Sequence, residues 1–362
     1  MNQPNPDGFL RTNDVFPPGA DPAEARDRIA RGDLTSVCRG IWAPEVPEDP
    51  IARHLQLVRA CLFRSRHPMV VAGRSAALLH GLPPAPGTLL HQAEFVLPGK
   101  GRSGTDYLAH ATKLPDHHVV EVGGLRATTL ARTLVDLNRP PTWCVRVPHG
   151  LVGLVALEAA LYRCADTEVL RADYLGVVDD LQGCAGMAAA KRALSMATSH
   201  AAGPAETISR LVMAAHGLPL PLLDVAYPDE IGLGNLGRTV RLPFCWPRPG
   251  VMGVVLDGRD GVPIGVGLRR WEWQALAGRI RATGWYLVEW AVGELAWPWD
   301  FCQRLDTVLS EGLEPPRELP WRALGRVPEE PPDDSFPYDP YYSRDSIDPA
   351  EDEGAPWRSD VG

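Results

Sequence analysis

The segment Arg238–Gly258 constrains the fold of this chain more than any other stretch. It contains two apolar runs, Thr239–Trp246 and Val251–Leu256, separated by a short turn rich in Pro and Gly. Apolar runs of this length, bounded by turn residues, are typical of buried β-strands. The segment therefore predicts two adjacent strands inside a sheet.

The elements expected around these strands extend the prediction to a whole domain, residues 203–312. Their order is a helix, three strands, a second helix and a last strand, with the flanking elements at Gly203–His216, Leu222–Tyr227, Trp271–Arg281 and Trp285–Trp290. Helices alternating with strands in this way indicate a sheet covered by helices. With the regions described below, the chain is expected to be an α+β or α/β multidomain protein.

In detail, Arg238–Gly258 resembles the two central strands of a Vsr-like PD-(D/E)XK nuclease core. Such a core carries an Asp directly before a Phe-any-Trp-Pro run and a Glu two residues before an Asp-Gly pair. Here Pro243 and Val255 stand at those places. A metal-dependent nuclease binds its cation through carboxylate oxygens, which neither side chain has. The resemblance implies a degenerate nuclease domain that holds no metal or other cofactor, and Pro243 also predicts an edge or a bulge in its strand.

Three residues match what remains of the nuclease pattern: Glu206 and Arg210 on the first helix, and Asp257 in the Asp-Gly pair. Each has an ordinary structural interpretation, which we prefer. Glu206 complements the dipole at a helix start, and Asp257 is a common turn residue before glycine. The alternative is a weak, Mg²⁺-dependent DNA endonuclease whose ligands have been rearranged.

Residues 9–44 predict a small winged helix. Asp21 and Pro22 form a strong helix start, Gly32 a natural helix end, and a hairpin is expected to turn at Arg39-Gly40. In such a domain the helix enters the major groove and the hairpin contacts phosphates. The candidate DNA contacts are Arg26, Arg28, Arg31 and Arg39. Against this stand the plainer interpretation, an amphipathic helix with a solvated arginine face, and the lack of a first helix within residues 1–8.

Residues 51–147 predict a mixed body, with a helix at Ile51–Arg64, strands at Ala93–Leu97, Tyr107–Ala109 and His118–Val122, and a helix capped by a Thr at 128–129. The Gly-rich loop 98–104 carries Lys100 and Arg102, two further candidates for phosphate contact, although a flexible hairpin loop is the simpler interpretation.

Two other pairs in this body concern charge and metal binding. Arg132 and Asp136 are spaced for an i,i+4 ion pair, which we interpret as structural. His117 and His118 are adjacent, and neighbouring residues on a strand point to opposite faces. These two histidines are therefore not expected to chelate one ion together.

Three strings, in their order and spacing, carry a second resemblance: RGIWAP, GRSAALLHGLP and TTLARTLVDL. They resemble the AbiEi-type antitoxins of type IV toxin–antitoxin systems, in which a winged helix precedes an antitoxin body and long members continue into a Vsr-like domain. The resemblance implies a cytoplasmic, non-catalytic, antitoxin-like regulator that binds DNA weakly at a toxin–antitoxin or defence locus. It also implies a toxin partner of the nucleotidyltransferase type.

The remaining segments add a connector and a tail. Residues 148–200 predict helices at Leu151–Arg163, Asp166–Leu181 and Gly186–Met196 without a catalytic constellation. Residues 327–362 hold 11 acidic and two basic side chains, which predicts a disordered tail. No apolar run is long enough to cross a bilayer, and the N-terminus lacks the pattern of a secretory signal. Seven scattered cysteines without a CxxC motif indicate reduced thiols and no metal site.

Overall fold

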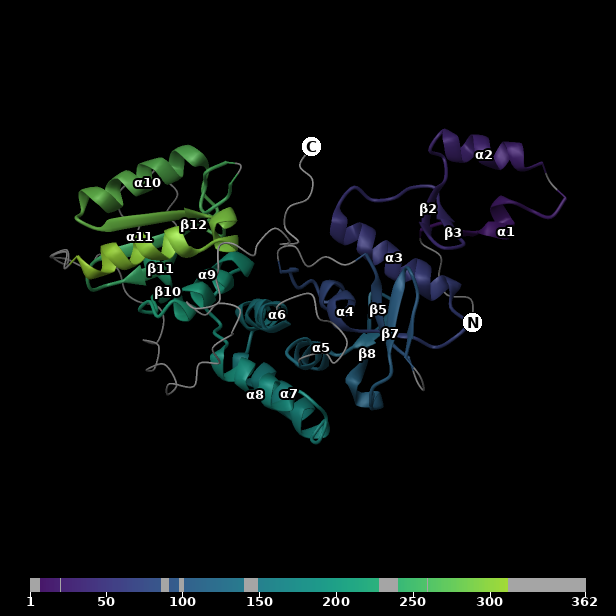
Figure 1. The fold of residues 1–362 in the computed structure, drawn as a ribbon, viewed down its shortest axis with the longest axis horizontal. Helices are drawn as coiled ribbons and strands as arrows, with labels where there is room; N and C mark the ends of the chain where they lie inside the picture. The colour runs from purple at the N-terminus through teal and green to yellow at the C-terminus, as the bar shows by residue number, and fades with distance from the viewer. Residues whose placement is uncertain are drawn as a thin grey trace, which may run out of the picture. The chain divides into compact units, whose positions relative to one another are not determined.

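The computed structural model describes residues 7–19, 21–85, 91–97, 101–139, 149–227, 240–258 and 260–311. The chain forms two compact units, residues 1–204 and 205–362. Both units combine helices with sheets, so the predicted α+β multidomain fold class is confirmed (Figure 1). The predicted acidic tail, 327–362, lies outside the described residues.

The first unit begins with a three-stranded sheet and two helices. The elements are β1 (Leu10–Arg11), α1 (Thr12–Val15), α2 (Pro22–Ala30), β2 (Thr35–Cys38) and β3 (Ile41–Ala43), with strand order β1-β3-β2. Asp21 caps α2 by accepting a hydrogen bond from the backbone N–H of Ala23 at 2.9 Å, as the sequence predicts. The one-turn helix α1 was missed, because it lies at 12–15 and not within residues 1–8. Its start is held by Asp14, whose carboxylate accepts from the Arg11 N–H at 2.7 Å.

The body of this unit is a six-stranded sheet with α3 (Pro50–Arg64) packed on it. Its strands are β4 (Val70–Val71), β5 (Ala93–Val96), β6 (Arg102–Ser103), β7 (Tyr107–His110), β8 (Val119–Val122) and β9 (Leu125–Thr128), in the order β6-β7-β5-β4-β9-β8. Val58 and Cys61 of α3 share a core with Phe95 and Ala127 of the sheet. The three predicted strands are confirmed. The other three were missed, and two of these have only two residues, too few to show an alternating pattern.

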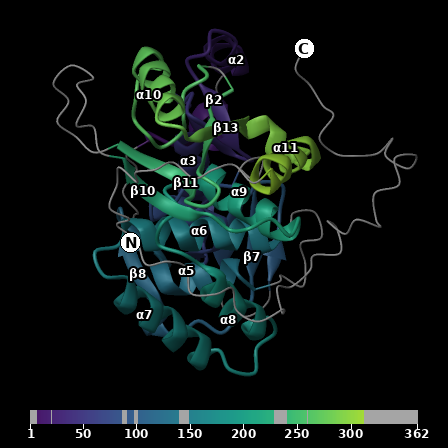
Figure 2. The same ribbon diagram turned by 90° about the vertical axis from the view of Figure 1, so that its left-hand side faces the viewer.

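Five further helices complete the described part of the first unit, one inserted between two strands of the sheet and four after its last strand. They are α4 (Gly73–Leu79), which lies between β4 and β5, and then α5 (Leu130–Leu137), α6 (His149–Arg163), α7 (Thr167–Asp180) and α8 (Met187–Met196). In Figure 2, α5 lies beside α6, and α7 beside α8. Thr129 caps α5 by accepting from the Arg132 N–H at 3.3 Å, and Asp166 caps α7. The predicted helices of this region are confirmed.

The second unit is a four-stranded sheet with helices on both faces. Its elements are α9 (Pro204–Ala215), β10 (Leu222–Tyr227), β11 (Val240–Trp246), β12 (Val251–Leu256), α10 (Arg270–Ala282), β13 (Tyr286–Ala291), η2 (Val292–Ala296) and α11 (Trp299–Ser310). The strand order is β10-β11-β12-β13, and only the last pair is parallel. The predicted element order and the pairing of the two central strands are confirmed.

Each face of this sheet has its own helical layer. On one face, Trp273 and Ile280 of α10 pack with Met252 and Val254 of β12. On the other, Trp290 stacks on Phe301 of α11, with ring centroids 4.9 Å apart, and donates a 3.0 Å hydrogen bond to Ser209 Oγ of α9. The buried indole N–H is thus satisfied within the core.

Pro243 lies in a central strand and not at an edge, because β11 is paired on both sides. The predicted bulge is not found between β10 and β11 either, because their register is the same on both sides of Pro243; the disturbance is a local irregularity of the ladder. The ladder between β10 and β11 skips the pair Asp224–Pro243, and Asp224 has a left-handed backbone with φ of 54°. The α10-facing residues of β11 are Leu242 and then Cys245, so the alternation of side chains shifts by one residue here. The missing N–H of proline is accommodated at this shift.

Candidate functional site

Two histidines and an aspartate converge at the junction between the sheet of the first unit and α7. Nε2 of His117 lies 2.7 Å from Asp180 Oδ2, and Nε2 of His118 lies 3.0 Å from the same oxygen. The ligand atoms of the three side chains all lie within 4.8 Å of one another. A metal site needs several His, Cys, Asp or Glu side chains close together. Among the described residues, these three form the group whose spacing could hold a metal ion.

The prediction that His117 and His118 point to opposite faces is wrong. It placed both on a strand, whereas residues 116–118 form the 3₁₀ helix η1 and the strand β8 begins at Val119. On a tight helix, adjacent side chains are not held to opposite sides, and the two rings lie 4.5 Å apart. His118 is buried, at 2% exposed, whereas His117 remains 67% exposed.

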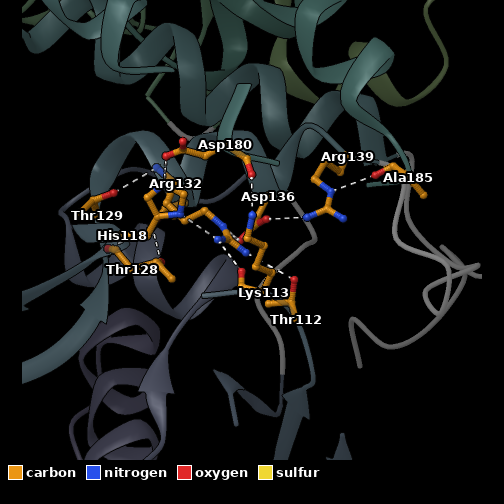
Figure 3. Close-up of polar contacts among 11 residues, drawn as sticks. Thr112, Lys113, His118, Thr128, Thr129, Arg132, Asp136, Arg139, Asp180 and Ala185 are labelled. Carbon is orange, nitrogen blue, oxygen red and sulfur yellow. Dashed lines mark hydrogen bonds and ion pairs between the residues drawn. The ribbon is translucent and has the colours of Figure 1, made fainter. Parts of the chain in front are cut away.

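Arg132 of α5 contacts His118 at Nδ1, the ring nitrogen that does not face Asp180 (Figure 3). Its fully buried guanidinium donates from Nη1 to His118 Nδ1 at 3.0 Å and to the carbonyl of Lys113 at 2.9 Å. Its Nε donates to Asp136 Oδ2 at 2.7 Å, as the i,i+4 spacing predicts. A buried cation is tolerated only when paired and hydrogen-bonded, and these contacts provide both.

The same network reaches the turn between α7 and α8. Arg139 donates to Asp136 Oδ1 at 3.0 Å and to the carbonyl of Ala185 at 3.0 Å. Lys113 Nζ donates to the carbonyl of Asp180 at 3.1 Å. Asp136 therefore connects two arginines, and α5 is joined to both ends of the α7–α8 turn. We call this set the Arg132 clasp: Lys113, His117, His118, Arg132, Asp136, Arg139 and Asp180.

The Arg132 contact decides the protonation of His118. Arginine stays charged and has no lone pair to offer, so it is the donor and Nδ1 of His118 is the acceptor. A neutral imidazole carries one hydrogen, which must then be on Nε2, where it is donated to Asp180. A metal ion bound to Nε2 would need a lone pair on that nitrogen, so the ring hydrogen would have to move to Nδ1. Nδ1–H would then face a guanidinium N–H of Arg132. In the observed arrangement only His117 and Asp180 offer lone pairs to a cation, fewer than the three protein ligands of a catalytic zinc site.

The pKa shifts fit a neutral histidine and a charged aspartate. Burial lowers the pKa of His118, and the nearby charge of Arg132 acts in the same direction. The hydrogen bonds from His117 and then His118 lower the pKa of Asp180. The clasp is thus a chain of hydrogen-bonded side chains that runs from Asp136 through Arg132 and the neutral His118 to Asp180, and ends at the exposed His117. Sequence reasoning missed it because Asp180 is 62 residues beyond His118, without a local motif to connect them.

The nuclease candidates are placed differently from one another. Glu206 and Arg210 are buried on α9, whereas Asp257 is exposed in the turn after β12. The backbone of Asp257 donates to Val262 O at 2.8 Å and accepts from Gly261 N at 3.0 Å, as an ordinary turn residue does. Val255 is only 1% exposed, so an apolar side chain fills the place of the missing glutamate.

The candidate DNA-binding residues lie on the first unit. Arg26 and Arg31 are exposed on and just after α2, Arg28 is half-buried, and Arg39 is exposed at the β2–β3 turn. Arg102 is exposed on β6, and Lys100 lies outside the described residues. Arg31 makes an exposed ion pair with Asp33 at 3.1 Å.

Two of these residues are brought together at the C-terminal end of α3. Arg64, the last residue of α3, donates to the carbonyl of Arg39 at 2.8 Å and pairs with Asp106 at 3.0 Å. Asp106 also accepts from the backbone N–H of Arg39 at 3.1 Å. Arg102 Nη1 lies 3.2 Å from Nε2 of His67, three residues beyond α3. The turn of the hairpin and β6 therefore border one surface, which we call the α3-end surface: Arg39, Arg64, Arg66, His67 and Arg102.

These features define a multidomain α+β protein with a charged clasp in its first unit. No protein-family model matches the chain. It is 30% identical over 223 residues to uncharacterized proteins of two Mycobacterium tuberculosis strains, CDC 1551 / Oshkosh and H37Rv, covering 61% of this chain and 72% of each relative. The chain belongs to the family of these mycobacterial proteins. Across the described residues, every helix falls short of the length and apolar character needed to cross a membrane.

Proposed function

We propose that this protein is a non-catalytic regulator of the antitoxin type, which contacts DNA through its first unit at a toxin–antitoxin or defence locus. The observation that carries the proposal is the gathering of arginines, most of them exposed, on and just after α2 and on the α3-end surface. Duplex DNA attracts such a surface through its phosphates, because arginine binding releases condensed counterions. Asp106, the acid that contacts the Arg39 turn, is already paired with Arg64.

The arginines of α2 suit phosphate contact for a second reason. The Arg31–Asp33 pair is exposed on both sides, at 65% and 51%, and such pairs contribute little stability. Exchange of Asp33 for a phosphate therefore costs the fold little. Ala25 is buried against Val15 and Leu34, so one side of α2 packs on this unit, whereas Arg26 and Arg31 remain exposed.

The second unit supports the non-catalytic part of the proposal. Hydrolysis of a phosphodiester by a PD-(D/E)XK site needs carboxylates on the two central strands to hold a divalent ion. These positions are Pro243 and Val255, both buried. We propose that this unit serves as a scaffold or as a protein-contacting domain. A toxin of the nucleotidyltransferase type is the partner that the antitoxin resemblance implies.

The test is fluorescence anisotropy with labelled random duplex DNA at two salt concentrations. The key variant replaces Arg26, Arg28, Arg31 and Arg39 with alanine. A matched control removes four exposed cations elsewhere: Arg126, Lys191, Arg192 and Arg270. We expect the key variant to lose most of the affinity and the control to keep it. Wild-type affinity should fall with a log–log salt slope of about −0.9 per phosphate contact.

Equal binding by the wild type and the key variant would overturn the DNA-contacting role. Equal loss in both quadruple variants would show that only total charge matters, and would overturn the assignment to α2 and its hairpin. Circular dichroism of each variant checks that the fold is retained.

A further inference from the structure

Two cysteines meet where the N-terminal hairpin packs on α3. Cys38 is the last residue of β2, and Cys61 lies on α3, one turn before Arg64. Both belong to one apolar core, at 4% and 1% exposed, and both are free thiols. Asp106 links the surroundings of both thiols: its carbonyl lies 3.8 Å from Cys61 Sγ, and its carboxylate accepts from the backbone N–H of Arg39, the residue after Cys38, at 3.1 Å.

The surroundings of the pair distinguish its two thiols. The hydrogen bond from Cys61 lowers the pKa of Cys38, and the Arg64 guanidinium lowers it further. The same hydrogen bond and burial raise the pKa of Cys61 well above its usual range. Elsewhere, burial alone raises the pKa of Cys245 and of Cys302 to about 12. The pair thus leaves Cys38 as the more acidic thiol, and its thiolate is the nucleophilic form.

We propose that Cys38 and Cys61 are a redox modification site, at which hydrogen peroxide forms a reversible disulfide between the hairpin and α3. The inference goes beyond the proposed function and does not depend on DNA binding. It rests on the burial of both thiols in one core, on their common neighbour Asp106, and on the Arg64 guanidinium that pairs with this aspartate.

The chemistry balances in two steps. The Cys38 thiolate attacks one oxygen of hydrogen peroxide, the O–O bond breaks, and a sulfenic acid and hydroxide form. The sulfur of Cys61 then attacks the sulfur of Cys38, and the S–OH bond breaks. The hydroxyl takes up the Cys61 proton and leaves as water, and an S–S bond remains. The hydroxide of the first step takes the proton that Cys38 released when it ionised, and becomes the second water. In total, two thiols lose two electrons and two hydrogens, and one peroxide is reduced to two waters.

Access to the buried pair comes from the hairpin. β2 and β3 have four and three residues, and their register shifts between Ser36 and Cys38. Such short strands open locally at low cost in free energy. The bond would close the loop between residues 38 and 61, and would fix the Arg39 turn on α3. A thiol reductant would reverse it.

The experiment uses the full chain in its native state. The protein is treated with hydrogen peroxide, alkylated after denaturation, digested and mapped by mass spectrometry with and without dithiothreitol. We expect a peptide pair linked through Cys38 and Cys61, two hydrogens lighter than the reduced pair and released by dithiothreitol. Cys38→Ser and Cys61→Ser should each lose the link, and Cys302→Ser, a buried cysteine of the other unit, should keep it.

Because the mapping is done on the wild type, it does not depend on the stability of the serine variants. Full alkylation of both cysteines after peroxide treatment would overturn the proposal. So would oxidation of Cys38 to a sulfinic acid without any linked peptide, or a link from Cys38 to a different cysteine.

Discussion

Nη1 of Arg132 donates a 3.0 Å hydrogen bond to Nδ1 of His118, so a permanent cation faces one nitrogen of a buried imidazole. Protonation of His118 would place an N–H against an N–H and a positive charge against a positive charge. The imidazole is therefore held neutral, and its other nitrogen donates to Asp180. The contact therefore fixes the orientation of the His118 ring and makes the stability of the fold depend on pH.

The first prediction concerns pH. The folded-state pKa of His118 is lowered, so the unfolded chain binds the proton more tightly. The contribution of His118 to stability is thus fully present above the unfolded value of about 6.5 and is lost as pH falls through the lower folded value. Urea unfolding at pH 7.5 and pH 5 should show a loss that shrinks in His118→Gln. An equal loss in the variant would contradict this assignment.

The second prediction is that Arg132→Met destabilises the protein by about 3–5 kcal/mol, because it removes the buried donors to Asp136 Oδ2, His118 Nδ1 and the Lys113 carbonyl. Arg132→Lys should restore only part of this stability, since an ammonium cannot reproduce the planar set of N–H donors. The control Arg126→Met, at an exposed position, should change stability by no more than about 0.5 kcal/mol. Urea denaturation measures all three, and equal effects of Arg132→Met and Arg126→Met would refute the central role of Arg132.

The third prediction tests the packing of the second unit. A Cβ added at Gly253 would lie 2.8 Å from the ring of Trp290 and 3.1 Å from that of Trp246. Gly253→Ala should destabilise by about 1–3 kcal/mol, as overpacking of a core does. Gly278→Ala, in α10 with open space around the position, should stabilise by about 0.5–1 kcal/mol. Thermal unfolding of both variants would decide it, and a stabilising Gly253→Ala would argue against this packing.

The fourth prediction is that the protein does not cut DNA in Mg²⁺ or Mn²⁺. The reason is the apolar side chains at Pro243 and Val255, where ligands would be needed. A supercoiled plasmid should stay intact with the wild type and equally with Glu206→Ala and Asp257→Ala. Nicking that disappears in either variant would show that the metal ligands have moved to other positions.

The fifth prediction concerns the acidic segment 327–362, with its 11 acidic and two basic side chains. Its deletion should strengthen DNA binding at low salt, because these acids compete with phosphates for the arginines of the first unit. The gain should shrink as salt rises, since screening weakens the competition. A neutral Gly/Ser segment of equal length serves as the control. If it binds like the wild type, length and not charge is responsible.

The sequence alone was sufficient for most of the longer helices and strands and for the order of elements from α9 to β13, whereas α1, α4 and α11 were not predicted. The predicted elements follow from local signals: Asp21 and Thr129 cap helices through their own side chains, and apolar runs such as Val251–Leu256 require burial wherever they occur. The Arg132–Asp136 pair was also predictable, because its partners are one helical turn apart.

Tertiary structure alone decided how distant groups meet. Asp180 reaches His117 and His118 only because α7 ends beside η1, and Cys38 reaches Cys61 only because the hairpin packs on α3. The two-residue strand β4 exists because its neighbours β5 and β9 offer backbone partners, not because of its own pattern. Local patterns encode backbone conformation and burial, whereas contacts between side chains far apart in the chain depend on how the elements pack. The clasp and the thiol pair are both of this second kind.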